Sequence, residues 1–281
     1  MANAATPKAG VMGWPISHSL SPRLHGFWLQ TLNLAGSYDA IPVAPEDLPT
    51  ALRALAANGL RGVNLTVPHK VAACAIVDRM DATAQRMGAI NLVTVESDGK
   101  LLGRNTDAYG FAQNLLTSGF PPANGTAFVL GAGGATRAVI VALIDMGFSK
   151  ILLSNRTAEK AQKLAQEFST PQCPITVIPW SEKPDLEGVE LVVNTTSLGM
   201  TGQPTLVFDL DGLPPSATVT DIVYAPLETD LLHQAKTKGY KTIDGLGMLL
   251  HQARPAFAAF FGHDPKVTEE LRTHVLAGRK S

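Results

Sequence analysis

The sequence has few charged residues and only two cysteines. Asp, Glu, Lys and Arg make up 17% of the 281 residues, against about 25% in average soluble proteins. Basic and acidic residues nearly cancel, to a net charge of -1, which gives no support for a nucleic-acid or anionic-membrane partner. Cys74 and Cys173 are the only cysteines, so a disulfide scaffold and a cysteine-rich metal site are excluded.

Long apolar segments are also lacking. Residues 108–136 contain no Asp, Glu, Lys or Arg, but Pro121-Pro122 interrupts them, so they cannot span a bilayer as one helix. Residues 1–10 have no apolar core and do not read as a secretory signal. We therefore expect a cytoplasmic enzyme or binding protein. Its length favours two domains, because a single core rarely grows much beyond this size.

The first part of the chain predicts a mixed sheet. Ser21-Pro22 reads as an N-cap followed by proline at the first helical position. Asp98-Gly99 is a strong hairpin turn, and it places two antiparallel strands among parallel ones. Strands are predicted over residues 10–12, 38–43, 62–65, 91–96 and 100–102.

From residue 107 onward the pattern is more regular. Strands that alternate with helices of this length predict a parallel, doubly wound sheet. The region from 245 to 277 lacks strand signals and predicts two helices. The other helices are predicted over 108–117, 134–146 and 158–168, and the strands over 126–130, 150–154, 175–178, 191–194 and 219–223.

The most informative motif follows the apolar run 127–130. Gly131 permits a tight turn, Gly133 lets the backbone approach a pyrophosphate, and the N–H groups of the following helix face the phosphates. Thr136 replaces the third glycine of the common dinucleotide fingerprint. A glycine-rich helix entry without a ligand is the alternative interpretation.

The next strand end indicates which dinucleotide binds. A site that prefers NAD places a carboxylate there for the ribose 2′-hydroxyl, whereas this chain has Asn155, Arg156 and Thr157. Arg156 can pair with a 2′-phosphate and stack on adenine, which favours NADP. Thr157 could instead only cap the helix 158–168.

Polar residues also follow the strand-like runs of the first part of the chain. Ligands of open α/β sheets bind at the carboxyl ends of strands, and these neutral groups with one Lys and one Asp suit a small polyhydroxylated acid. Taken singly each has a structural alternative: Lys70 could be a solvated lysine, and Asp107 an N-cap. The candidates are Ser17, Ser19, Asn64, Thr66, Lys70, Asn91 and Asp107.

With these motifs in order, the chain resembles the NADP-dependent shikimate dehydrogenase family over almost its whole length. The resemblance rests on residues 13–22, 64–70, 88–91, 105–107, 131–135, 155–157, 194–200, 221–224 and 245–253. It implies reversible, NADPH-dependent reduction of 3-dehydroshikimate to shikimate, in the shikimate pathway of aromatic amino-acid biosynthesis. It also implies two domains: a discontinuous mixed-sheet α/β substrate domain (1–106 plus 245–281) and a Rossmann-type doubly wound NADP domain (107–244).

The resemblance further implies roles for individual residues. Lys70 and Asp107 would form the catalytic pair. The substrate would contact Ser17, Ser19, Asn64, Thr66, Asn91, Tyr224 and Gln252. The NADP site would be lined by Gly131, Ala132, Gly133, Gly134, Ala135, Asn155, Arg156, Thr157, Lys160, Thr195, Ser197, Ile222, Gly245 and Met248. We expect a monomer or homodimer that binds small molecules and no metal.

Three positions depart from the family's usual pattern: Gly26, Leu92 and Ala225 stand where Asn, Thr and Asn are frequent. None removes a proposed catalytic group. Two alternatives stay open. One is a quinate/shikimate dehydrogenase using NAD, which the lack of an acid at Thr157 and the serine at Ser19 disfavour. The other is a non-catalytic regulator that binds a pathway metabolite on the same fold.

Overall fold

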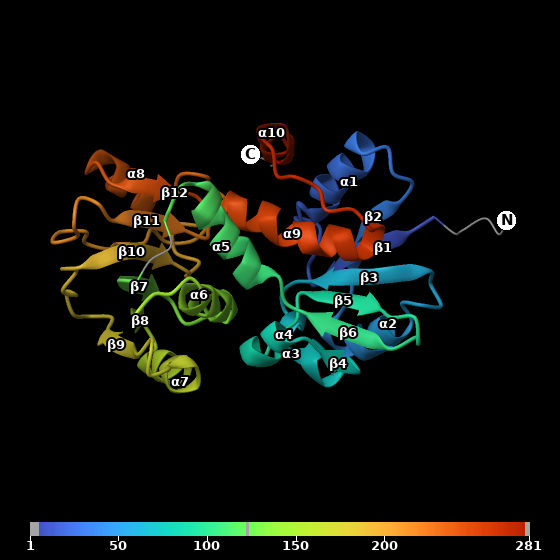
Figure 1. Ribbon diagram of the computed structural model, residues 1–281, viewed down its shortest axis with the longest axis horizontal. Helices are drawn as coiled ribbons and strands as arrows, with labels where there is room; N and C mark the ends of the chain where they lie inside the picture. The colour runs from blue at the N-terminus through green and yellow to red at the C-terminus, as the bar shows by residue number, and fades with distance from the viewer. Residues whose placement is uncertain (1–5, 122–123, 279–281) are drawn as a thin grey trace. The chain divides into compact units, whose positions relative to one another are not determined.

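The computed structural model describes residues 6–121 and 124–278, in two compact units (Figure 1). Unit 1 comprises the chain up to Thr106 and from Gln252 on, and unit 2 comprises Asp107–His251. The second boundary falls inside helix α9 (Leu246–Phe261), later than the residue 245 expected from the sequence. The beginning of α9 packs within unit 2, where His251 Nε2 lies 3.2 Å from Thr117 Oγ1.

Unit 1 is built on a six-stranded mixed sheet in the order β2-β1-β3-β5-β6-β4. β1 pairs in parallel with β2 and β3, whereas β5 is antiparallel to both β3 and β6. The predicted mixture of strand directions is therefore confirmed. The strands are β1 (Lys8–Gly13), β2 (Ser37–Pro42), β3 (Leu60–Leu65), β4 (Arg79–Met80), β5 (Leu92–Val95) and β6 (Leu101–Arg104).

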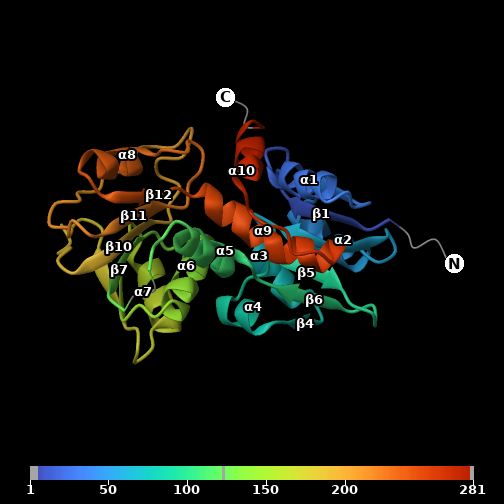
Figure 2. The ribbon, with the colours of Figure 1, turned by 45° about the horizontal axis from the view of Figure 1, so that its top comes forward.

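Helices cover both faces of this sheet (Figures 1 and 2). One face packs its apolar side chains, such as Val63 and Val93, against Leu52 and Ala84 of two short helices. The other face meets α9, since a Cβ on Gly62 of β3 would press on the Phe260 ring. The helices with residues in unit 1 are α1 (Ser21–Thr31), α2 (Leu48–Arg53), α3 (His69–Ala72), α4 (Ala82–Met87), α9 and α10 (Glu269–Leu276), with 3-10 turns at Pro45–Asp47 and Ala73–Ala75.

Two turns of unit 1 show how local chemistry sets the chain path. Ser21, predicted as the N-cap of α1, is instead its first residue, and Leu20 occupies the cap position. The Ser19 hydroxyl accepts the Ser21 N–H at 3.3 Å, so the capping oxygen comes from one residue earlier. The predicted Asp98-Gly99 turn is present, and Gly99 supplies the positive φ of 79° that the hairpin needs.

A buried histidine lies under α1. His25 is fully buried and stacks in parallel on the Tyr38 ring, with 3.8 Å between centroids. Neither ring nitrogen has a hydrogen-bond partner among the described residues. Burial lowers the pKa of His25 from 6.5 to about 3, so the imidazole is neutral at physiological pH.

Unit 2 contains the parallel sheet expected from the sequence. Its order is β12-β11-β10-β7-β8-β9, and every pairing is parallel. The chain runs outward from β7 in one direction and then from β10 in the other, which is the doubly wound topology. The strands are β7 (Thr126–Leu130), β8 (Lys150–Asn155), β9 (Ile175–Pro179), β10 (Val189–Asn194), β11 (Thr218–Asp221) and β12 (Lys241–Ile243).

The faces of this sheet are covered differently. α6 (Gly134–Asp145) packs between α5 (Asp107–Thr117) and α7 (Ala158–Phe168), and α7 lies on β8 and β9. The core around Phe128 and Val219 is instead closed by α8 (Asp230–Thr237) and by Leu206, Leu210 and Leu213 of the β10–β11 connection. Within the described part of the chain, no helix is long and apolar enough to cross a membrane.

Candidate active site

The glycine-rich loop joins β7 to α6, as predicted. Gly131 has a φ of 109°, and a Cβ there would lie 2.6 Å from Thr195 Oγ1, so both the backbone and the packing require glycine. Gly133 has an ordinary φ of -90°, and a Cβ there would meet nothing within 4 Å. The fold therefore does not explain a glycine at 133. A ligand that approaches the backbone would explain it.

Thr136, which replaces the third fingerprint glycine, ties the loop to β10. Its hydroxyl accepts the Gly133 N–H at 2.9 Å and lies 2.8 Å from Thr195 Oγ1. Thr195 Oγ1 in turn donates to the Leu130 carbonyl at 2.7 Å. Since each hydroxyl has one proton, Thr136 donates to Thr195. The relay fixes the loop and leaves the other N–H groups of the first turn of α6 without intrahelical partners, as at any helix start.

Next to this loop, at the end of β8, several polar side chains make no hydrogen bond or ion pair with the described residues. The Asn155 amide donates to the Thr157 carbonyl at 2.8 Å, and Thr157 occupies the N-cap of α7 without a side-chain hydrogen bond. Capping alone therefore does not account for the Thr157 hydroxyl. Arg156 and Lys160 are exposed, and Arg156 has no hydrogen-bond or ion-pair partner among the described side chains. These groups fit the phosphates of an NADP molecule.

The remaining predicted cofactor residues of unit 2 follow neighbouring strands. Thr195 and Ser197 follow β10, and Ile222 follows β11. Gly245 lies directly against the Ile222 and Val223 carbonyls, where any side chain would clash with the backbone. Met248 is half-buried in the first turn of α9. The structure thus brings Gly131 to Thr195 and Ile222 to Gly245.

In unit 1 the predicted substrate residues form one hydrogen-bonded group. Asn64 Oδ1 accepts the Tyr38 hydroxyl at 2.7 Å, and Asn64 Nδ2 donates to the Asn91 carbonyl at 3.0 Å. Asn91 Oδ1 accepts the Thr106 N–H at 2.8 Å, and its Nδ2 lies 3.4 Å from Gln252 Oε1. These bonds fix which amide atoms are oxygen and which are nitrogen, so the group has a defined set of donors and acceptors.

Three further predicted residues lie beyond β1 and β3. Ser17 lines a cavity of about 370 Å³ with Trp14, Ile16 and Pro42 at the carboxyl ends of β1 and β2. The Ser19 hydroxyl accepts a backbone N–H, so its own proton is still able to donate. Thr66 follows β3 directly and contacts Gly13 at the end of β1.

The predicted catalytic residues lie on different units. Lys70 is the second residue of α3 and is half-buried, so it is not a fully solvated lysine. Asp107 is buried and lies inside the first turn of α5, not in the N-cap position that a helix beginning at 108 would give it. Tyr224 is half-buried on the loop after β11. The pairing of Lys70 with Asp107 stays a prediction.

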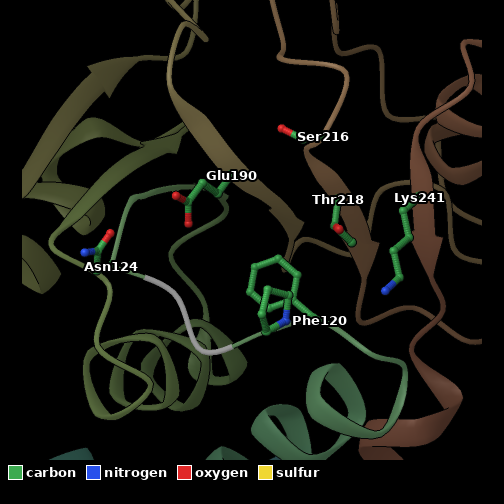
Figure 3. A pocket seen from close by; sticks show the side chains of 7 residues that line it. Phe120, Asn124, Glu190, Ser216, Thr218 and Lys241 are labelled. Carbon is green, nitrogen blue, oxygen red and sulfur yellow. The ribbon is translucent and has the colours of Figure 1, made fainter.

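A cavity of about 680 Å³ lies at the opposite, amino edge of the unit 2 sheet (Figure 3). Figure 3 shows Glu190 and Lys241 on either side of Thr218, at the beginnings of β10, β12 and β11. None of the predicted site residues lines it. Since ligands of such sheets bind at the carboxyl edge, we do not assign this cavity to substrate or cofactor.

Comparison with known proteins identifies the family. Residues 11–93 match the shikimate dehydrogenase substrate binding domain, and residues 115–198 match the shikimate/quinate 5-dehydrogenase family. A shikimate dehydrogenase (NADP(+)) of Paramagnetospirillum magneticum is 53% identical over 273 residues, which cover 96% of this chain and 98% of the relative. The chain belongs to the shikimate dehydrogenase family.

Solved structures of a shikimate dehydrogenase and a quinate dehydrogenase share this fold. The Thermus thermophilus enzyme in complex with NADP(H) and shikimate is 38% identical, with a TM-score of 0.86 over 96% of this chain and 99% of that one. A quinate dehydrogenase from Corynebacterium glutamicum in complex with NAD is 29% identical, with a TM-score of 0.89 over 97% and 99%. The predicted fold class, with one mixed and one Rossmann-type sheet, is confirmed.

Sequence reasoning missed several residues that shape the site of this shikimate dehydrogenase family member. Tyr38 orients Asn64 through a hydrogen bond between side chains 26 residues apart. Thr136 departs from the fingerprint, yet it anchors the glycine loop. Asn194 and Asp221 are two further residues whose role the sequence does not predict. The available signal was that both are polar residues at the carboxyl ends of apolar strands.

Proposed function

We propose that this protein catalyses the reversible, NADPH-dependent reduction of 3-dehydroshikimate to shikimate, a step of aromatic amino-acid biosynthesis. Similarity over nearly the full length to NADP(+)-dependent shikimate dehydrogenases supports the reaction. The choice of NADP over NAD depends on the end of β8. Arg156 there has no partner among the described side chains, and no carboxylate occupies the position that would bind a ribose 2′-hydroxyl. Unit 2 is the NADP domain and unit 1 the substrate domain.

NADPH, when bound, supplies the hydride. The Gly131–Ala135 loop and the first N–H groups of α6 would hold the pyrophosphate, and Arg156 with Lys160 would hold the 2′-phosphate. Gly133 would admit the phosphates, because no protein atom lies within 4 Å of where its Cβ would be. The other groups assigned to the cofactor are Asn155, Thr157, Thr195, Ser197, Ile222, Gly245 and Met248.

The substrate is held by neutral hydrogen-bonding groups. Ser17, Ser19 and Tyr224 donate to its carboxylate. The orientation of Asn64 and Asn91, fixed by Tyr38 and Thr106, lets their amides distinguish ring hydroxyls, with Thr66 and Gln252 completing the set. Such a site rejects an analogue that lacks a hydroxyl, because the analogue leaves buried protein groups unpaired.

Proton transfer accompanies the hydride. The C3 oxygen gains negative charge as the hydride arrives, and Lys70 donates a proton to it as general acid and takes it back in the reverse direction. Asp107 orients the Lys70 ammonium and accepts a hydrogen bond from a substrate hydroxyl. In single-turnover measurements, Lys70→Ala should slow hydride transfer by about 10²–10⁴-fold. An unchanged rate with only a raised KM would remove this assignment.

The test of the reaction is an absorbance assay with shikimate or quinate against NADP or NAD. We expect the highest kcat/KM for shikimate with NADP. Preference for quinate with NAD would favour the alternative dehydrogenase, and binding of shikimate without turnover would indicate a regulator. A cytoplasmic location and a monomeric or homodimeric state stay predictions, for cell fractionation and light scattering to test.

A further inference from the structure

The carboxylate of Asp221 is buried at the end of β11, where it is 1% exposed. Its hydrogen-bond partners within residues 6–121 and 124–278 are all neutral. Oδ1 accepts the Val223 N–H at 2.9 Å, Oδ2 accepts the Thr229 hydroxyl at 2.7 Å, and Asn194 Nδ2 lies 3.0 Å from both oxygens. Among the described residues no Lys, Arg or His forms an ion pair with it. Burial of a carboxylate costs free energy of folding unless hydrogen-bond donors reach its oxygens, as they do here.

These bonds join three segments of chain at the carboxyl edge of the sheet. Asn194 ends β10, Val223 lies in the loop after β11, and Thr229 caps the helix α8. The Asn194 carbonyl also accepts the Ile222 N–H at 3.1 Å. The loop after β11 is therefore held through the N–H groups of Ile222 and Val223. The first donates to the Asn194 carbonyl and the second to the Asp221 carboxylate.

Asn194 extends the network into the loop after β10. Its Oδ1 accepts both the N–H and the hydroxyl of Thr196, at 2.9 and 2.8 Å. Its Nδ2 lies 3.2 Å from the Leu198 carbonyl. The two loops fixed in this way carry the proposed cofactor contacts Thr195, Ser197 and Ile222 and the proposed substrate contact Tyr224.

We propose that Asp221 is a positioning residue, which holds the loops 195–198 and 222–224 in the one arrangement that presents cofactor and substrate contacts together. This inference rests on the proposed function of those contacts. Only a carboxylate suits the position, because every neighbour of its two oxygens is a donor. An asparagine would place its NH₂ group against Asn194 Nδ2 in either orientation, and in addition against the Val223 N–H or the Thr229 hydroxyl.

The experiment compares Asp221→Asn with Thr220→Val in the full chain. Thr220 precedes Asp221 on β11, is equally buried and donates one hydrogen bond, to the Ile243 carbonyl at 2.9 Å. Both variants lose buried hydrogen bonds, so both should have a lower Tm. A small displacement of groups that bind substrate or cofactor lowers the catalytic rate strongly. Because only Asp221 holds the two loops, only Asp221→Asn should lower kcat/KM, by about 10–100-fold. Its KM should rise for both shikimate and NADP.

Cofactor affinity supplies a readout that needs no turnover. The Kd for NADPH, from its fluorescence, should rise in Asp221→Asn and stay near wild type in Thr220→Val. If Asp221→Asn has wild-type KM and Kd values at a temperature well below its Tm, the residue is only structural and the proposal is overturned. Failure of the wild-type protein to turn over shikimate would instead refute the proposed function.

A milder pair of variants covers the case in which Asp221→Asn does not fold. Thr229→Val removes the donor to Asp221 Oδ2 together with the oxygen that accepts the Leu232 N–H at the start of α8, and it changes neither loop. Thr229→Ser retains the hydroxyl for both bonds. We expect Thr229→Val to raise both KM values in the same direction as Asp221→Asn but less, and Thr229→Ser to restore them. Equal KM values in the two Thr229 variants would contradict the proposal.

Discussion

Two glycines of the nucleotide loop should respond in opposite ways to the same substitution. Gly131→Ala forces a non-glycine residue to a φ of 109° and drives its Cβ to 2.6 Å from Thr195 Oγ1. Backbone strain of this kind costs about 1–3 kcal/mol, and overpacking adds about 1–3 kcal/mol. Since 1 kcal/mol moves Tm by about 2–4 °C in a protein of this size, Tm should fall by at least about 4 °C.

Gly133→Ala should leave the free protein unchanged. Its φ of -90° suits alanine, and the added Cβ meets no protein atom within 4 Å. The methyl group would instead occupy space that we propose for the pyrophosphate. An overpacking cost of about 1–3 kcal/mol in the complex corresponds to a Kd for NADPH raised by about 5–150-fold.

Thermal unfolding and fluorescence titration of both variants against wild type measure these effects. The reasoning requires a lowered Tm for Gly131→Ala, and a wild-type Tm with weakened NADPH binding for Gly133→Ala. A Gly133→Ala variant that binds NADPH as tightly as wild type would refute the placement of the pyrophosphate on this loop. A Gly131→Ala variant with unchanged Tm would refute the packing argument.

Two further variants test single groups. Arg156→Ala should raise the Kd for NADPH by about 10–150-fold, the effect of one charge-assisted hydrogen bond of about 1.5–3 kcal/mol; an equal loss of NADH binding in the same titration would argue against a 2′-phosphate contact. The pKa of His25 is about 3 when folded and 6.5 when unfolded, so the unfolded state binds the extra proton and stability falls as pH drops through this window. His25→Phe should recover about 2 kcal/mol of the stability lost between pH 6.5 and 5, and urea unfolding at both pH values that shows no difference from wild type would contradict this.

The sequence predicted those features that depend on local pattern. The alternation of strands and helices after residue 107, the mixed sheet before it and the glycine loop all follow from periodicity and turn chemistry. Predictions of individual capping residues were less accurate. Ser21 was the best candidate by residue type, but the chain path gives the capping oxygen to Ser19. Short elements such as β4 (Arg79–Met80) and β12 (Lys241–Ile243) carry too few residues for a pattern.

The supporting bonds of the site could not be predicted, since they join residues far apart in sequence. Thr136 and Thr195 are 59 positions apart, and Asn194 and Asp221 are 27 apart. Nothing in either local segment specifies its partner. Only the packing of parallel strands, which brings their carboxyl ends to one edge, places these side chains within hydrogen-bond distance.

The division of unit 1 between both ends of the sequence has a consequence during protein synthesis. Its sheet strands leave the ribosome first, but Phe257 and Phe260, whose rings lie near His25 and Tyr38, come only after all of residues 107–251. Unit 2 is continuous and can complete its own core earlier. For the time needed to make that unit, one face of the unit 1 sheet is covered by α1 but still lacks α9. Apolar surface exposed in this way on a nascent chain is prone to aggregation, which chaperones counteract.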